Sequence, residues 1–432
     1  MAGKKKQAQL TPEEKLQQAL VPEAEQPYKV PANWCWVKAP FIFNIEYGKG
    51  LSSKELLEKG YPVFGANGQI GYYNEYMFEN AKALMSCRGA YSGTMNLSLP
   101  KSFVTSNSLI IDSKGAGMSE HFTYFLFSAL NKKSIISGSA QPQITVQAFA
   151  KYPIPLLPLV EQQRIVERIE SLFAKLDEAK ENLQNVLDGF ETRKAAILHK
   201  AFTGELTANW RKQHDVSIDS WGKNKLGEIN EIGTGGTPSR KIAAYYNGNI
   251  PWIKTGEILW NYIYDSEEKI TNNAINNSSA KFYSKGTVLV AMYGQGLTRG
   301  RAAILAIEAT TNQAVCALKP KQVLKSKFLF YYFMENYWKY REKAIGGNQP
   351  NYSIKMISKW NINLPTLDEQ TEIVRIIDDL LAKEQQAKEL AENALAKIDL
   401  IKKSILARAF RGELGTNNPA DEPAVELLKR ML

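Results

Sequence analysis

Residues 161–206 read EQQRIVERIESLFAKLDEAKENLQNVLDGFETRKAAILHKAFTGEL, and residues 369–414 repeat the pattern as EQTEIVRIIDDLLAKEQQAKELAENALAKIDLIKKSILARAFRGEL. The two stretches align without a gap at an offset of 208 residues. An internal repeat of this kind indicates that one structural plan has been duplicated. We therefore expect the chain to consist of two copies of one plan.

Apolar residues in both stretches recur at alternating spacings of four and three, which is the pattern of a coiled-coil seam. Large residues in the middle of the first stretch face alanines in the second, which favours packing of the two helices on each other. The residues expected to pack are Ile165, Ile169, Leu172, Leu176, Leu183, Val186, Phe190 and Ile197 in the first helix, and Ile373, Ile377, Leu380, Ala387, Ala391, Ala394, Ile398, Ile401 and Ile405 in the second. Arg193 and Glu384 are polar positions within the same pattern.

Helix-end signals flank both stretches. Thr366 and Glu369 form a capping-box pattern, and Gly204 and Gly412 are placed to end the helices. A helix of about 40 residues spans about 60 Å. If the two helices run antiparallel, the segments that precede them lie at opposite ends, related by an approximate twofold axis. A long-helix spacer with no partner beyond itself is an equally weighted alternative for the helix pair.

The segments between the repeats contain short apolar and β-branched runs separated by Gly, Asn, Ser and Pro, a pattern typical of short strands and long loops. The predicted fold class is α+β, with two mixed α/β-type globular domains separated by a long antiparallel two-helix coiled coil with pseudo-twofold symmetry. The predicted boundaries are an N-terminal arm (1–27), a first globular domain (28–157), a central helix (158–206), a second globular domain (207–365), a C-terminal helix (366–414) and a tail (415–432). The arm is expected to be flexible, with a single docking turn.

The net charge of +10 is unevenly distributed. Residues 27–155 carry +5 and residues 207–365 carry +10, whereas residues 161–206 and 366–414 each carry −2. Positive charge concentrated in the two globular segments predicts a polyanionic partner for them. A charge that serves solubility alone would not require such segregation.

Several protein classes are not supported by the composition. No apolar run reaches the length of a membrane span, and the basic N-terminus lacks the apolar core of a signal peptide. The three cysteines and three histidines are too scattered for a disulfide framework or a zinc site. We expect no membrane association, no bound metal and a cytoplasmic location.

No catalytic motif is present. Gly294-Gln295-Gly296 with Gly300 lacks the spacing and the following helix of a dinucleotide-binding loop, and no Walker A or GxSxG motif occurs. Asn348-Gln349-Pro350-Asn351-Tyr352 differs from the Asn-Pro-Pro-Tyr motif of amino-methyltransferases and predicts a turn instead. We therefore expect neither catalytic residues nor a cofactor in this chain.

The basic segments instead have loops rich in hydrogen-bond donors. Lys and Arg contact phosphates or read guanine, Asn and Gln read adenine, and Glu accepts from cytosine. A solvated surface role remains the alternative for each residue taken singly. The candidate DNA-binding residues are Lys49, Ser53, Lys54, Asn67, Arg88, Tyr91 and Ser92 in the first segment, and Thr237, Arg240, Lys241, Lys254, Thr255, Glu257, Tyr293, Gln295, Arg299 and Arg301 in the second.

The repeated helices ending in FTGEL and FRGEL, the preceding IPLLPLVEQQ and NLPTLDEQ, and the motifs GTGGTPSR, NIPWIKTGEI and GGNQPNYS resemble the specificity subunit of type I restriction-modification systems. The resemblance covers residues 28–414. The first domain has Gly48-Lys49-Gly50 where the second has the fuller GGTP form, so its first loop departs from the pattern.

The resemblance implies two target recognition domains, each reading half of a split sequence in double-stranded DNA, and two helices that set the spacing. It also implies docking of two modification (methyltransferase) subunits, which carry S-adenosylmethionine, and of restriction subunits, which use ATP for translocation and cleavage. This chain would then be non-catalytic and bind no cofactor. The alternatives are a stand-alone DNA-modifying enzyme and a coiled-coil DNA-binding adaptor without sequence specificity.

Overall fold

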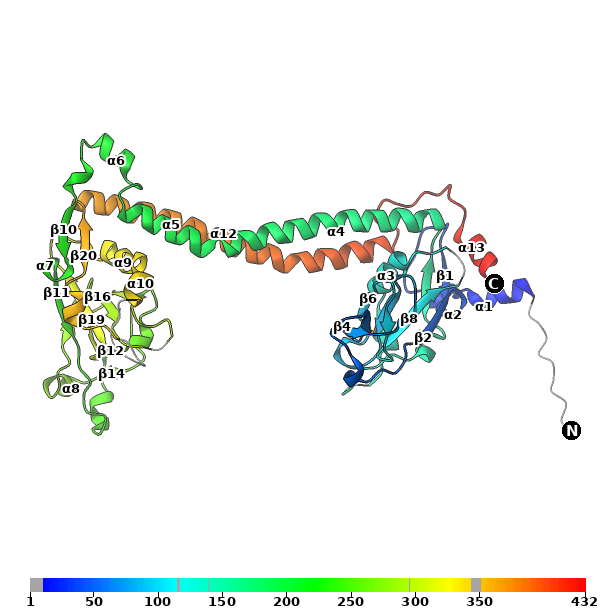
Figure 1. Cartoon of the computed structure of the whole chain (residues 1–432), viewed down its shortest axis with the longest axis horizontal. Coiled ribbons are helices and arrows are strands. Elements are labelled where there is room, and N and C mark those ends of the chain that lie inside the picture. The colour runs from blue at the N-terminus through cyan, green and yellow to red at the C-terminus, as the bar shows by residue number, and fades with distance from the viewer. Residues whose placement is uncertain (1–10, 115–116, 139, 295, 343–350) are drawn as a thin grey trace. The chain divides into compact units, whose positions relative to one another are not determined.

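The structure is a computed structural model that describes residues 11–114, 117–138, 140–294, 296–342 and 351–432. The chain forms two compact units: unit 1 comprises Met1–Leu183 and Asn393–Leu432, and unit 2 comprises Gln184–Glu392 (Figure 1). Each unit combines one globular domain with segments of both long helical stretches. Within the described residues, no helix is long and apolar enough to cross a bilayer.

The globular part of unit 1, here called domain 1, is a mixed α/β structure. Its sheets have the strand orders β2-β8-β5-β6, β4-β3-β7 and β1-β9. All pairings are antiparallel except β3 with β7. The strands are β1 (Cys35–Lys38), β2 (Phe43–Tyr47), β3 (Tyr61–Gly65), β4 (Gly68–Tyr73), β5 (Ala83–Ser86), β6 (Met95–Leu97), β7 (Phe103–Val104), β8 (Ser108–Ser113) and β9 (Pro153–Leu156), and the helices are α2 (Ala39–Ile42) and α3 (Glu120–Ala129).

The globular part of unit 2, here called domain 2, has sheets with the strand orders β11-β19-β16-β17-β13, β14-β12-β18-β15 and β10-β20. Its strands are β10 (Gly222–Lys225), β11 (Asn230–Thr234), β12 (Ile250–Ile253), β13 (Tyr262–Ile263), β14 (Lys269–Ile270), β15 (Phe282–Tyr283), β16 (Val288–Ala291), β17 (Ala302–Leu305), β18 (Ala309–Thr311), β19 (Val315–Pro320) and β20 (Asn361–Leu364). Its helices are α6 (Ala208–Gln213), α7 (Leu226–Ile229), α8 (Asn272–Asn276), α9 (Ser326–Glu335), α10 (Tyr337–Arg341) and α11 (Ile354–Ile357).

The two domains share one topology. The order β2-β8-β5-β6 in domain 1 matches β11-β19-β16-β17 in domain 2, and β4-β3-β7 matches β14-β12-β18. Register agrees as well, since Ile45 pairs with Ile111 and Ile232 pairs with Leu318. The central strands β5 and β16 are buried along their whole length, which explains why their sequences are continuous apolar runs and not alternating ones. The duplication seen in the helical repeats therefore extends to the domains.

The long helical stretches form α4 (Leu159–Asp188), α5 (Phe190–Phe202) and α12 (Leu367–Ala409). The prediction of one continuous helix over 158–206 is wrong at Gly189, where a turn separates α4 from α5. In domain 2, α9 and α10 are likewise separated by a single residue, Asn336. Gly204 and Gly412 follow their helices with positive φ values of 81° and 76°, the left-handed conformation that a glycine after a helix adopts without steric cost.

Helical segments run antiparallel within each unit. In unit 1, Arg164 contacts Thr416 and Asp177 contacts Lys402, so the partner number falls as the first number rises. In unit 2, the Phe190 ring lies 4.9 Å from the Lys388 amine, and Arg193 donates from Nε to both carboxylate oxygens of Glu384, at 3.0 and 2.8 Å. The two polar positions of the predicted seam thus pair with each other.

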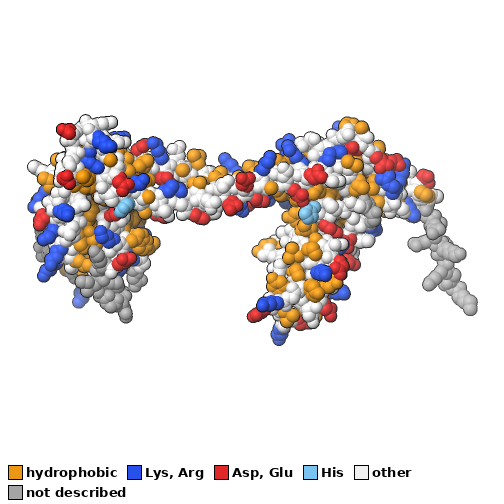
Figure 2. Space-filling view, turned by 45° about the horizontal axis from the view of Figure 1, so that its top comes forward, with side chains coloured by type: hydrophobic (Ala, Val, Ile, Leu, Met, Phe, Trp, Pro, Cys, Tyr) orange, Lys and Arg blue, Asp and Glu red, His pale blue; other side chains and the backbone are white. Residues whose placement is uncertain are grey.

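Burial along the predicted seam is uneven. Ile165 and Ile169 are fully buried because domain 1 covers them, and Ile373 and Ile377 are fully buried because domain 2 covers them. The remaining residues of the predicted set are buried or half-buried, apart from the three corrected next; they are Leu172, Leu176, Leu183, Phe190, Ile197, Leu380, Ala391, Ala394, Ile398 and Ile405. Figure 2 shows acidic and basic side chains interspersed on the visible face of the helical segments.

Three residues of that predicted set are exposed, contrary to expectation: Val186, Ala387 and Ile401. Lys388 and Lys402 lie half-buried in place of Ala387 and Ile401, with each ammonium group 4.9 Å from the centre of a Phe ring. The two departures are local, because Ala391, Ala394 and Ile398 between them are buried or half-buried as predicted. A lysine covers apolar surface with its aliphatic stem, so it can lie inward beside an aromatic ring of the neighbouring helix.

The segment predicted as a flexible arm packs against unit 1 over its described part. Helix α1 (Pro12–Ala19) contacts α13 (Ala424–Met431), and Ala19 is fully buried. Helix α13 contributes Leu427 and Leu428 to the core of domain 1. Segments near both ends of the chain are therefore structural parts of unit 1.

Candidate nucleic-acid interface

The loop GTGGTPSR of domain 2 follows β11 and is fixed by close backbone approach. A Cβ atom on Gly235 would lie 1.8 Å from the carbonyl oxygen of Thr311, and one on Gly236 would lie 2.1 Å from the hydroxyl of Ser279. Side chains at these two positions would collide with the neighbouring strand and turn. The paired glycines therefore let the loop lie directly against domain 2.

Two aromatic residues hold the rest of this loop. The Trp252 Nε1 group donates to the Gly236 carbonyl at 2.9 Å, and the Tyr246 hydroxyl donates to the Pro238 carbonyl at 2.6 Å. The same rings carry Arg240, whose guanidinium carbon lies 4.1 Å from the centre of the Tyr246 ring and 5.1 Å from that of Trp252. Cation–π contacts with both rings hold the guanidinium of Arg240 close to the surface of its own domain.

An acidic pair faces Arg240. The Arg240 Nη2 group lies 2.6 Å from Glu268 Oε2, and the Lys254 amine lies 3.2 Å from Glu267 Oε2 and 3.7 Å from Glu268 Oε1. The hydrogen bond from Arg240 lowers the pKa of Glu268, and the hydrogen bond to Glu267 raises the pKa of Lys254. Both cations are therefore charged at neutral pH and paired within the domain.

Glu257, predicted to accept from a cytosine, has partners within domain 2. Its Oε1 accepts from the backbone N–H of Lys254 at 2.8 Å, and its Oε2 accepts from the backbone N–H of Glu267 at 3.0 Å. Its contact with a base stays a prediction. Glu257 ties the turn that carries Lys254 to the turn that carries Glu267 and Glu268.

The other candidates of domain 2 lie on nearby loops. Thr237 donates to the Gln313 side chain, Lys241 and Tyr293 are exposed, and Thr255 and Arg301 are half-buried. The loop after β16 is held from α10, because Arg341 donates to the Arg299 and Gly296 carbonyls. The Arg299 guanidinium lies 5.9 Å from the Tyr352 ring. Gln295, and Asn348 to Pro350 of the predicted turn, lie outside the described residues.

In domain 1, the candidates are spread over three loops. Lys49, Ser53 and Lys54 are exposed after β2, Asn67 is exposed in the turn between β3 and β4, and Arg88 and Tyr91 are exposed after β5. Ser92 is half-buried and donates to the Pro142 carbonyl at 2.7 Å, so its hydroxyl is engaged within the domain. The GKG loop keeps one feature of its counterpart, since a Cβ on Gly48 would lie 2.4 Å from the Thr105 carbonyl oxygen.

The sequence did not identify a pair of buried glutamates at the helix starts. In unit 2, the fully buried Glu369 accepts from Trp221 Nε1 at 2.9 Å, Thr207 Oγ1 at 2.7 Å and Arg211 Nη1 at 2.6 Å. The segment that follows α5 therefore surrounds the start of α12. A sequence signal of this arrangement is that Trp34 and Trp221 stand at matching positions, directly before β1 and β10.

Unit 1 contains the same arrangement with the helices exchanged. The fully buried Glu161 accepts from Trp34 Nε1 at 2.7 Å, Asn417 Nδ2 at 2.8 Å and Thr416 Oγ1 at 3.3 Å. Here the segment that follows α12 surrounds the start of α4. Each domain is thereby fixed to the start of its following helix, which orients the donor-rich loops with respect to that helix.

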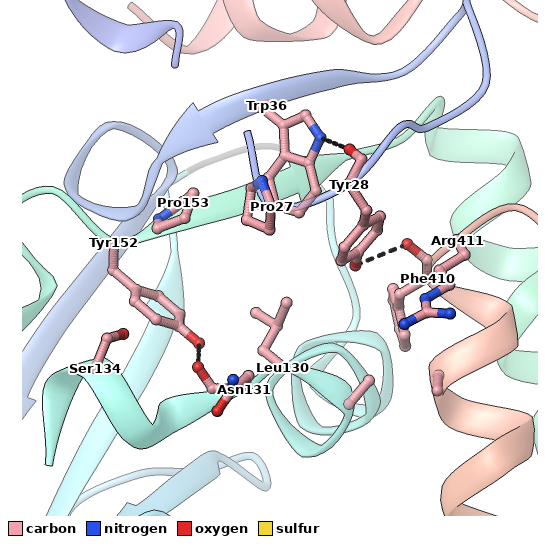
Figure 3. Close-up of a pocket in the computed structure, with 12 residues that line it drawn as sticks. Pro27, Tyr28, Trp36, Leu130, Asn131, Ser134, Tyr152, Pro153, Phe410 and Arg411 are labelled. Atoms are coloured by element: carbon pink, nitrogen blue, oxygen red, sulfur yellow. Dashed lines mark hydrogen bonds between the residues drawn. The ribbon is translucent and has the colours of Figure 1, made fainter. Parts of the chain in front are cut away.

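A cavity of about 370 Å³ in unit 1 is lined by residues of domain 1 and of the segment around the end of α12 (Figure 3). The Tyr28 hydroxyl donates to the Phe410 carbonyl at 3.1 Å, and the Tyr152 hydroxyl donates to the Asn131 carbonyl at 2.9 Å. Burial raises the pKa of Tyr28 to about 12, although the nearby Arg411 opposes the shift. Both phenol groups are neutral and donate to backbone carbonyls, so the residues around the cavity serve to join parts of unit 1.

Comparison with known proteins gives a consistent result. A family described as "Type I restriction modification DNA specificity domain" matches residues 31–188 and 218–393. The chain is 23% identical over 426 residues to the EcoDI specificity subunit of Escherichia coli, covering 91% of this chain and 92% of that protein. It is 25% identical over 344 residues to the StySPI specificity subunit of Salmonella potsdam, covering 78% and 70%.

The fold agrees with that of solved structures. The HsdS subunit from Thermoanaerobacter tengcongensis superposes with a TM-score of 0.63 at 18% identity, covering 90% of this chain and all of that one. A chain from a study of complex assembly and conformational transition in the type I R-M system gives a TM-score of 0.59 at 18% identity, with 90% of this chain covered.

Proposed function

Because this chain belongs to the type I restriction-modification DNA specificity family, we propose that its two domains each read one half of a split sequence in duplex DNA. The observation that carries the proposal is the shared topology of domains 1 and 2 combined with different loop residues at equivalent positions. A common scaffold with divergent loops suits two related readers of two different sequences. The positive charge of both domains suits the phosphate backbone.

The helical segments serve, in this proposal, as spacer and docking surface. Antiparallel contacts within each unit, such as Arg193 with Glu384, support a single antiparallel coiled coil that sets the distance between half-sites. The specificity subunits named above belong to type I restriction enzymes, so we propose two modification subunits and, in a complete complex, restriction subunits as partners. S-adenosylmethionine and ATP would bind to those partner subunits, and this chain would be non-catalytic.

Mapping of methylated adenines tests the proposal. DNA from cells that express the chain together with its modification subunits is expected to carry one methylated motif with two distinct halves and an unspecified spacer. Replacing Arg88 should relax recognition in one half only, since its side chain is exposed on a loop of domain 1. A motif in one continuous piece, or an Arg88 variant that alters both halves, would contradict the two-reader proposal.

The two alternative functions give different outcomes in the same system. A stand-alone DNA-modifying enzyme would methylate DNA when the purified chain is incubated with S-adenosylmethionine alone. An adaptor without specificity would bind duplexes of any sequence equally, and its presence would not direct methylation to a motif.

A further inference from the structure

We infer that Arg240 and Lys254 form a binding position for one phosphate group of the DNA backbone, and that Glu267 and Glu268 occupy this position in the free protein. The inference rests on the proposed function, because it names the chemical group that one part of domain 2 contacts. It distinguishes these two residues from residues that contact base edges and thereby determine which DNA sequence is bound.

The position of Arg240 is constrained by two aromatic rings. Its guanidinium carbon lies over Tyr246 and Trp252, at 4.1 and 5.1 Å from the ring centres, and both rings are held by hydrogen bonds to the loop that carries Arg240. Its Nη2 edge is directed at Glu268. A guanidinium held against two rings of its own domain does not extend to a base edge, whereas a phosphate on the duplex surface can approach it.

The carboxylate of Glu268 bridges the two cations. One oxygen of Glu268 lies 2.6 Å from Arg240 Nη2, and its other oxygen lies 3.7 Å from the Lys254 amine. Two cations therefore share the two oxygens of one anion. A phosphate diester presents two non-bridging oxygens with the same charge, so the arrangement already fits that group.

The internal carboxylates of Glu267 and Glu268 can be displaced. The side chain of Glu267 is 75% exposed and that of Arg240 is 53% exposed, so water screens these ion pairs and each stabilises the fold little. Glu257 holds the backbone of both turns, so the carboxylates can move without loss of the loop structure. A polyanion that releases counterions on binding competes effectively for such cations.

Duplex binding by the full-length chain tests the inference. A pool of random-sequence duplexes first yields the sequence that the wild-type chain selects, and affinities are then measured for that sequence and a scrambled one over a range of salt concentrations. For R240Q/K254Q we expect weaker binding to both duplexes by the same factor. We also expect the slope of log affinity against log salt to shrink by about one, since the variant loses one phosphate contact and each such contact contributes about 0.9.

The variant E267Q/E268Q gives the opposite and more decisive result. Without the internal carboxylates, both duplexes should bind more tightly and with a steeper salt dependence, a gain that misfolding cannot produce. The matched control is E231Q/K319Q, which removes another exposed ion pair of domain 2, and it should leave the affinities and the slope unchanged.

Three results would overturn the inference. They are a change in the selected sequence for R240Q/K254Q, an unchanged salt slope in that variant, or unchanged or weaker binding by E267Q/E268Q. Failure of the proposed function has a different signature, because the wild-type chain would then select no common sequence from the pool.

Discussion

Arg211 is predicted to be the residue whose loss most weakens the junction between domain 2 and helix α12. Its side chain is 10% exposed, and its Nη1 group lies 2.6 Å from Oε1 of Glu369, which is fully buried. Substitution of Arg211 by Met keeps the aliphatic stem but leaves a buried carboxylate without its cation. Removal of one partner of a buried ion pair costs about 3–5 kcal/mol.

The structure places the expected cost at the lower end of that range. Glu369 keeps hydrogen bonds from Thr207 and Trp221 in the variant, and these partly stabilise its charge. Arg211 also donates to the Gly204 carbonyl at 2.7 Å, and this bond is lost too. We expect Arg211→Met to lower the free energy of unfolding of unit 2 by about 3 kcal/mol.

The assay is urea-induced unfolding followed by Trp fluorescence. Hydrogen exchange would assign the transition to unit 2, because a chain with two units need not unfold in one step. Lys212→Met is the matched control, since Lys212 is an exposed neighbour and should change stability by less than about 0.5 kcal/mol. The double variant with Glu369→Gln should recover part of the loss, because it removes the unpaired charge.

Two results would refute this reasoning. If Arg211→Met and Lys212→Met have equal effects, the buried pair does not stabilise the junction. If the double variant loses the sum of the two single effects, Arg211 and Glu369 are not coupled.

Three further predictions concern the loops, the helix and the pH dependence. Gly236→Ala should destabilise domain 2 by about 1–3 kcal/mol in thermal unfolding, since its Cβ would clash with Ser279. Gly256→Ala should have little effect, because the space around Gly256 is open. Equal effects would show that close approach is not the cause. Ile377 is fully buried, so Ile377→Ala should lower the free energy of unfolding in urea by about 2–5 kcal/mol. Leu390 lies on the same helix but is 62% exposed, so Leu390→Ala should cost much less. A large loss of stability in Leu390→Ala would indicate that this face is buried. Burial lowers the pKa of Lys132 to about 8, so between about pH 8 and pH 10.4 the folded state binds fewer protons than the unfolded state. The free energy of unfolding of unit 1 should therefore rise with pH in this range, and it should rise more in the wild type than in Lys132→Met. Equal slopes in pH-dependent unfolding would contradict the shift.

Local sequence patterns predicted where the long helices lie more reliably than which of their residues pack against the neighbouring helix. The 208-residue repeat identified both long helical stretches, and the glycines that follow them have the expected positive φ. The sequence pattern placed Ala387 and Ile401 on the inner face of the helix, whereas in the structure Lys388 and Lys402 lie there. Which residues face inward depends on where each helix meets its neighbour, which a fixed heptad count does not contain.

The candidate interface shows the same division. Donor-rich loops were recognisable from residue type, and Arg240 and Lys254 lie in one contact network. The sequence could not show that Glu257 accepts two backbone N–H groups, or that Glu267 and Glu268 neutralise the two cations. Those partners come from different turns, and only folding brings the turns together.

The sequence by itself determined the duplication, the long helices, the basic character of the two domains and the family, because periodicity, charge and motifs are properties of adjacent residues. Only the tertiary structure decided which charged side chains are paired within the protein and how each domain is fixed to its helix. Glu161 and Glu369 are ordinary helix-start residues in the sequence, and each becomes a buried anchor because a segment more than 150 residues away supplies hydrogen-bond donors to its carboxylate. Burial and pairing across such separations are set by the packed fold, and no local pattern encodes them.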